Sequence, residues 1–177
     1  MALATLVALV PGSLSAQRKA LDLEVKATYL FHFGQFVRWP AGAMAGDRPF
    51  TVCLLGRDPF GPVLDATLAD ETISGRRTVA KRLVTLDASE DCQMLFVGVE
   101  EEARLAGILR TLDGRPVLTV SDIPHFSERG GMIQFVAVDN RVRFEINLAA
   151  TEAARLMASS ELSRVAVTIR RNKVVDQ

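Results

Sequence analysis

Metal ligands and reactive side chains are scarce in this sequence of 177 residues, which contains only two histidines and two cysteines. His32 and His125 are far apart in the chain, and neither belongs to a cluster of the three or four ligands that a zinc site needs. Phosphate-binding loops, Gly-x-Ser-x-Gly elbows, His-Glu-x-x-His motifs and Cys-x-x-Cys motifs are absent. We therefore predict a protein without a metal, a cofactor or a catalytic site.

Neither positive nor negative charge is in excess in this sequence. The 21 basic and 21 acidic residues cancel, and neither sign forms a long block. This composition gives no support for binding to nucleic acid or to an anionic membrane surface. We therefore expect no nucleic-acid partner.

Long hydrophobic runs are missing as well. The run Ala2–Val10 is too short to span a bilayer, but it has about the length of the apolar region of a secretory signal peptide. Small residues, Ser13 and Ser15, precede a possible cleavage site before Ala16. We predict that residues 1–15 are a signal peptide and that the protein is exported. A disordered or core-packed N-terminal segment is the alternative.

The two cysteines lie in or next to segments that are expected to be strands. Cys53 is inside Phe50–Leu55, and Cys92 comes two residues before Met94–Val97. If these strands are neighbours in one sheet, the two sulfurs could meet and close a loop of about 39 residues, which would contribute about 4 kcal/mol. Two buried free thiols that pack as small hydrophobic groups are the alternative.

The stretch Arg115–Ala150 carries three strand signals and the start of a helix with little chain between them. Residues 116–120 form an apolar run rich in β-branched side chains, which predicts a strand covered on both faces. Two further strands should form a hairpin, because Asp139 and Asn140 between them tolerate the positive φ of a tight turn. Asn147 is expected to cap the helix that follows.

The rest of the chain alternates between helix and strand signals. Helices are predicted at Leu21–Trp39, Pro62–Leu68, Val99–Leu112 and from Asn147, with helical spacing again in the tail 159–171. Strands are predicted at Phe50–Leu55, 77–84, Met94–Val97, 116–120, 132–138 and 141–146. This order predicts a single α/β domain over residues 21–171, with a mainly parallel sheet, an antiparallel edge hairpin and helices on both faces.

Charged residues follow two of the predicted strands at their carboxyl ends, where open α/β sheets place ligands. Asp58 and Asp122 could face a shared crevice together with Arg57 and Arg129, and His125 lies in the same loop as Asp122. These five residues are the candidate ligand or partner surface. The alternative is structural, because tight strand-to-helix turns need no ligand and carboxylates are common at the start of loops.

Five segments of the chain, in order and spacing, resemble the YfiR family over roughly residues 24–170. They are KATYLFHFGQFVRWP (26–40), FTVCLLGRDPFG (50–61), CQMLFVG (92–98), RPVLTVSDIPHFSERGGMIQFV (115–136) and RVRFEINLAA (141–150). The family consists of periplasmic proteins best known as inhibitors of a membrane-bound diguanylate cyclase.

The resemblance implies a non-catalytic periplasmic domain, often dimeric, that binds the periplasmic region of a membrane diguanylate cyclase or another sensor protein. An outer-membrane lipoprotein can withdraw such a regulator from its target. The resemblance also implies a structural disulfide between Cys53 and Cys92. The best-known member has a second cysteine pair nearer its C-terminus, whereas this chain has no cysteine after Cys92. Redox control by such a second pair is therefore not carried over.

Three hypotheses about function follow. The first is a regulator that represses a membrane diguanylate cyclase, and so lowers cyclic-di-GMP, by protein-protein contact. The second is a small-ligand-binding sensor module that uses the five charged residues to bind an anion or metabolite. The third is a hydrolase whose nucleophile and base the sequence does not name.

Overall fold

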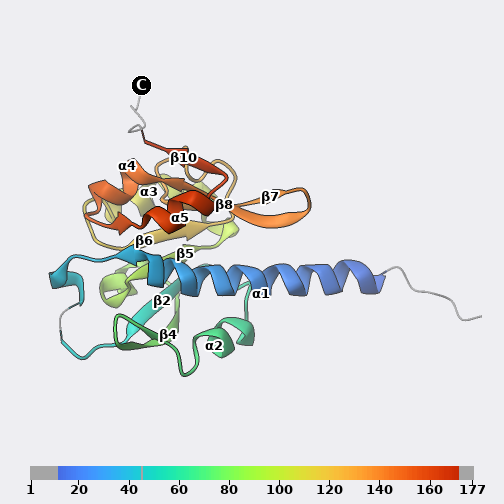
Figure 1. Cartoon of the computed structure of the whole chain (residues 1–177), viewed down its shortest axis with the longest axis horizontal. Helices are drawn as coiled ribbons and strands as arrows, with labels where there is room; N and C mark the ends of the chain where they lie inside the picture. The colour runs from blue at the N-terminus through green and yellow to red at the C-terminus, as the bar shows by residue number, and fades with distance from the viewer. Residues whose placement is uncertain (1–11, 45, 172–177) are drawn as a thin grey trace, which may run out of the picture.

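The structure, a computed structural model, describes residues 12–44 and 46–171 (Figure 1). Its strands are β1 (Val37–Arg38), β2 (Phe50–Leu55), β3 (Thr72–Ile73), β4 (Arg76–Leu83), β5 (Met94–Val97), β6 (Leu118–Ser121), β7 (Ile133–Val138), β8 (Arg141–Asn147), β9 (Met157–Ala158) and β10 (Thr168–Arg170). Its α-helices are α1 (Gly12–Phe36), α2 (Pro62–Leu68), α3 (Leu105–Thr111), α4 (Leu148–Ala153) and α5 (Ser160–Val165). Short 3₁₀ helices span Ala41–Met44, Leu86–Asp91 and Val99–Arg104.

Eight of the strands form one sheet in the order β10-β8-β7-β6-β5-β2-β4-β3. The five central strands, from β4 to β7, are parallel, while the β7–β8 and β3–β4 pairs are antiparallel. The chain moves outward from β2 to β4 and then returns to β5 on the other side of β2. The strand order therefore reverses between β2 and β5, and this switch point is where doubly wound sheets usually bind ligands.

Both faces of the sheet are covered at its centre, so every residue of β2, β5 and β6 is buried and most of these residues are apolar. In β2, Val52 and Leu54 belong to one core with α1, α2 and α5, whereas Cys53 and Leu55 belong to a second core with α3. Successive side chains of a strand point to opposite faces, which explains why a continuous apolar run is needed. The predicted α/β class, the mainly parallel sheet and the helices on both faces are confirmed.

The hairpin and the helix cap in the central stretch are confirmed in detail. Asp139 and Asn140 have φ of 47° and 60°, as the primed turn between β7 and β8 requires. The side-chain oxygen of Asn147 accepts a hydrogen bond from the backbone N–H of Ala150 at the start of α4. Local sequence therefore determines the turn and the cap.

Three features of the fold differ from the predicted ones. The tail 159–171 is not helical throughout, because α5 ends at Val165 and the chain then enters β10. Strand β10 pairs in parallel with β8, so the β7–β8 hairpin lies one strand inside the edge of the sheet. The segment predicted as a helix from Val99 begins as a 3₁₀ helix and becomes α-helical only at Leu105.

Helix α1 also differs from the helix predicted at Leu21–Trp39. It ends at Phe36, since the next two residues form β1 and pair with β9. It begins at Gly12, so residues 12–15 of the predicted signal peptide form its first turn. Residues 1–11 lie outside the described part of the chain, and cleavage before Ala16 stays a prediction.

Candidate functional site

The switch point between β2 and β5 is occupied by glutamate side chains. A Cβ atom on Gly98 would lie 2.8 Å from Oε2 of Glu100, and one on Gly56 would lie 3.1 Å from Cγ of Glu101. Glu101 is almost fully buried and forms an ion pair with the exposed Arg104 at 2.5 Å, without hydrogen-bond geometry. The protein's own carboxylates therefore fill the space where related sheet topologies receive a ligand.

Asp58 organises the turn between β2 and α2. One carboxylate oxygen accepts hydrogen bonds from the backbone N–H groups of Phe60 (2.7 Å) and Gly61 (3.1 Å). The other oxygen accepts a hydrogen bond of 2.9 Å from Arg82 at the end of β4. All the contacts of Asp58 are thus internal to the fold, as expected of a turn-forming carboxylate.

Arg82 binds a second carboxylate, Asp65 of α2, with two hydrogen bonds of 2.7 and 2.6 Å. The hydrogen bond from Arg82 lowers the pKa of Asp65, and the same bond raises the pKa of Arg82. Bidentate geometry favours this pairing because the guanidinium fork matches the carboxylate. The carboxyl ends of β2 and β4 and the first turn of α2 are therefore held together at one point.

The two predicted arginines lie on different loops of the same edge. Arg57 follows β2, has a side chain that is 83% exposed, and lies 3.7 Å from Glu100. Arg129 follows β6 and donates a hydrogen bond of 2.9 Å to Glu102. Each arginine therefore has a separate acidic partner on the segment that follows β5.

Asp122 and His125 lie on the loop after β6. Asp122 forms an ion pair of 2.9 Å with Lys26 of α1, and this lysine also lies over the ring of Phe135. His125 contacts Glu128 at 2.9 Å, and its φ of 58° places it in the left-handed region. The five predicted residues thus share the carboxyl edge of the sheet, but each has its own neighbours, and none of their side chains bonds to another of the five.

A partly buried polar network near this edge could not be predicted from the sequence. Ser127, which is fully buried, donates to Glu145 of β8 (2.8 Å) and accepts a hydrogen bond from Arg170 of β10 (3.1 Å). Arg170 also binds Glu128 at 2.7 Å. Since the partners are separated by 18 to 43 positions, only the folded sheet brings them together.

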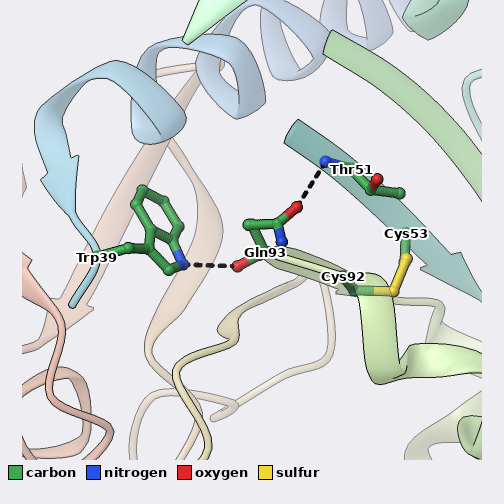
Figure 2. Close-up of a disulfide and its surroundings, with 5 residues drawn as sticks. All are labelled: Trp39, Thr51, Cys53, Cys92 and Gln93. Atoms are coloured by element: carbon green, nitrogen blue, oxygen red, sulfur yellow. Dashed lines mark hydrogen bonds between the residues drawn. A yellow bond between two sulfur atoms is a disulfide. The ribbon is translucent and has the colours of Figure 1, made fainter. Parts of the chain in front are cut away.

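The disulfide between Cys53 and Cys92 joins β2 to the segment that enters β5 (Figure 2). The next residue, Gln93, accepts a hydrogen bond from Thr51 N–H through its side chain and one from the indole N–H of Trp39 through its backbone carbonyl (Figure 2). The sequence predicted that the two sulfurs could meet if the two strands were neighbours in one sheet. Strands β2 and β5 are neighbours, and the two sulfurs are bonded. The bridge and Gln93 together tie the strand entry to the segment after α1.

A groove of about 600 Å³ runs between α1 and the β7–β8 hairpin, and we call it the α1–hairpin groove. Both elements project from the body of the molecule, where the hairpin extends alongside α1 (Figure 1). The walls of the groove are formed by Leu21, Asp22, Glu24, Val25, Thr28, Tyr29, His32 and residues 140–143. Sequence reasoning missed this groove, because the pairing of a helix with a distant hairpin is not a local signal.

Other kinds of site are not evident in the described residues. Within 12–44 and 46–171, no three His, Cys, Asp or Glu side chains are grouped so that they could hold a metal ion. None of the helices in that part of the chain is both long and apolar enough to cross a membrane. The candidate surfaces are the charged carboxyl edge and the α1–hairpin groove.

The sequence matches a known protein family. The sequence profile of the YfiR/HmsC-like family matches residues 23–167, which include every strand of the sheet except β10, as well as both cysteines and the whole carboxyl edge. No curated protein matches the chain in sequence.

Proposed function

Because the chain belongs to the YfiR/HmsC-like family, we propose that it is a periplasmic regulatory protein that represses a membrane-bound diguanylate cyclase. Repression acts by contact with the periplasmic region of the cyclase, and the protein performs no reaction itself. The observation that carries this proposal is the family match over residues 23–167, since the family is periplasmic and regulatory rather than catalytic. An outer-membrane lipoprotein that withdraws the regulator completes the proposed system.

Two features of the molecule support a role in binding another protein. The disulfide in the central strand pair suits an exported protein, because disulfides persist in oxidising compartments. The switch point, where a doubly wound sheet would bind a small ligand, is filled by Glu100 and Glu101. An anion site would also need Arg57 and Arg129 free, but these arginines already pair with Glu100 and Glu102. Both observations favour the regulator over the small-ligand sensor.

We propose the carboxyl edge as the surface that contacts the cyclase. Arg57, His125 and Arg129 present charged or polar groups there, and charges at the rim of an interface chiefly set association rate and specificity. Asp58 and Asp122 support the two loops from beneath through their ion pairs. Binding through such a polar surface would be reversible, as a regulated contact requires.

Deletion of the gene should raise cellular cyclic-di-GMP, and the wild-type gene should restore the original level. The double variant Arg57→Glu and Arg129→Glu should fold normally but weaken binding to the cyclase by about tenfold or more, since like charges at an interface are costly. Cyclic-di-GMP measured in complemented cells, together with cross-linking in intact cells, gives the result.

Arg77→Glu with Arg110→Glu is the matched control, because both side chains are exposed and lie outside the carboxyl edge. An unchanged cyclic-di-GMP level in the deletion strain, with no cyclase recovered by cross-linking, would refute the proposed function. Normal repression by the Arg57 and Arg129 variant would refute only the surface.

A further inference from the structure

Strand β10 is attached to the fold with little apolar burial. It contains only the three residues Thr168–Arg170, lies at the edge of the sheet and pairs with β8. The apolar side chains along this segment are largely open to solvent, since Val165 is 59%, Val167 45% and Ile169 38% exposed. Segments with few buried apolar contacts open locally at a lower free energy than the core does. Polar contacts therefore supply much of the attachment of β10.

Arg170 joins β10 to two other parts of the fold through its side chain. Its Nε donates a hydrogen bond of 3.1 Å to Oγ of Ser127, and its Nη2 donates one of 2.7 Å to Glu128. Both partners lie on the loop of residues 122–132, which connects β6 to β7 and which we call the β6–β7 loop. The same Nη2 lies 3.5 Å from Oε2 of Glu145 on β8. Hydrogen bonds between charged groups are stronger than neutral ones, so this side chain is the main polar anchor of β10.

The position of Ser127 depends on the same contacts. This residue is fully buried, and its hydroxyl donates a hydrogen bond of 2.8 Å to Glu145 while it accepts the one from Arg170. Its backbone N–H donates to the side chain of Gln134, and its carbonyl accepts a hydrogen bond from Asn147. If Arg170 left, the carboxylate of Glu145, which is 19% exposed, would lose its cationic partner. A mostly buried carboxylate without such a partner is costly, so loss of Arg170 destabilises the arrangement that fixes Ser127.

We propose that β10 is a strap whose attachment to β8 holds the β6–β7 loop in place, so that release of β10 loosens that loop. His125 and Arg129 lie on the loop, and His125 contacts Glu128, which Arg170 binds. A partner that captured β10 as an added strand would therefore act on the carboxyl edge without touching it. The coupling between the strap and the loop is a property of this fold, and it is independent of which partner the carboxyl edge contacts.

Hydrogen exchange measured by mass spectrometry on the purified full chain tests the proposal. The variant Arg170→Gln should raise the exchange rate of the hydrogen-bonded amides of the β6–β7 loop by about tenfold or more, because charged hydrogen bonds are lost. These amides include those of Phe126, Ser127 and Arg129. Exchange in β2 and β5 should stay at the wild-type rate, since the opening is local.

Arg164→Gln is the matched control, because this arginine precedes β10, is 75% exposed and forms its ion pair with Glu161. It should leave exchange in the loop unchanged. The reverse variant, Ser127→Ala, should speed exchange of the amides of Val167 and β10, since coupling between two sites is reciprocal. Wild-type exchange of the loop in Arg170→Gln, wild-type exchange of β10 in Ser127→Ala, or equal acceleration along the whole chain would each overturn the proposal.

Discussion

Among single residues, Arg82 has the largest share in holding the carboxyl edge together. Its guanidinium donates to Asp58, to Asp65 and to the backbone carbonyl of Gly61, so that β4, the β2–α2 turn and α2 meet at one side chain. The Arg82 side chain is 38% exposed, and water therefore weakens each ion pair. The arginine serves mainly to fix geometry, which a lysine could not do equally well because it lacks the planar fork.

The lowered pKa of Asp65 makes part of the stability depend on pH. A carboxyl whose folded-state pKa lies below its unfolded value stabilises the protein above the unfolded pKa, and this contribution is lost as the pH falls through the folded pKa. An unperturbed aspartate has a pKa of about 3.9, so the contribution should be complete above about pH 5 and decline below about pH 4. The variant Asp65→Asn should therefore be less stable than the wild type at pH 7, by less than about 1 kcal/mol, and the difference should shrink in acid.

Urea unfolding at pH 7, 5 and 3 measures this difference. Glu71→Gln is a suitable control, because Glu71 is exposed and no ion pair of its carboxylate is found in the described part of the chain. Its effect on the free energy of unfolding should be small at all three pH values. A difference between the wild type and Asp65→Asn that grows as the pH falls would contradict the assignment.

Among the secondary-structure elements, the buried strands could be predicted and the last strand could not. Phe50–Leu55 and Met94–Val97 are predicted correctly to the residue, because strands covered on both faces read as nearly continuous apolar runs. In the tail, Val165 and Ile169 recur at helical spacing, but both side chains are exposed. Their spacing therefore does not mark the buried face of a helix. Strand β10 forms because β8 offers it a free edge, and that information lies 23 positions away in the chain.

Two glycines illustrate how packing decides the effect of one substitution. A Cβ atom on Gly131, before β7, would lie 2.1 Å from the ring of the fully buried Phe126. Gly131→Ala should therefore destabilise the protein by about 1–3 kcal/mol, as overpacking does. Gly107→Ala in α3 meets no atom within 4 Å and should stabilise the protein by about 0.5–1 kcal/mol, because alanine favours helix.

Thermal unfolding of the two variants beside the wild type tests these opposite shifts. The pair controls for the chemistry of the change, since both replace glycine by alanine. Equal effects of the two substitutions would mean that the contact with Phe126 does not limit the space at Gly131.

For the whole molecule, topology explains what could be predicted of the site. Parallel strands bring their carboxyl ends to one edge, so Arg57, Asp58, Asp122, His125 and Arg129 could be assigned to a common edge from their positions alone. Most of their partners could not be assigned, because Lys26, Arg82, Glu100 and Glu102 come from other parts of the chain. The α1–hairpin groove depends on the same long-range packing.

The Cys53–Cys92 bridge acts on the stability of the whole molecule, because it joins neighbouring central strands and both cysteines are buried. It closes a loop of 39 residues and should contribute about 4 kcal/mol, mainly by restricting the unfolded chain. Cys53→Ala with Cys92→Ala should then lower the Tm by roughly 10 °C. The wild type measured in a reductant is the matched comparison, since it loses the bridge without losing the sulfur atoms.

Trp39, the only tryptophan, reports on this region because its indole N–H binds the carbonyl of Gln93, next to Cys92. Since the bridge lies between central strands, its loss should lower stability without creating a separate local opening. Trp39 fluorescence and far-ultraviolet circular dichroism should therefore give coincident unfolding curves in both oxidised and reduced protein. A fluorescence change at lower denaturant concentration than the circular dichroism change in the reduced protein would show instead that the bridge holds only the Trp39 region. Free thiols in the oxidised folded protein would mean that the bridge is absent, which contradicts the premise of the prediction.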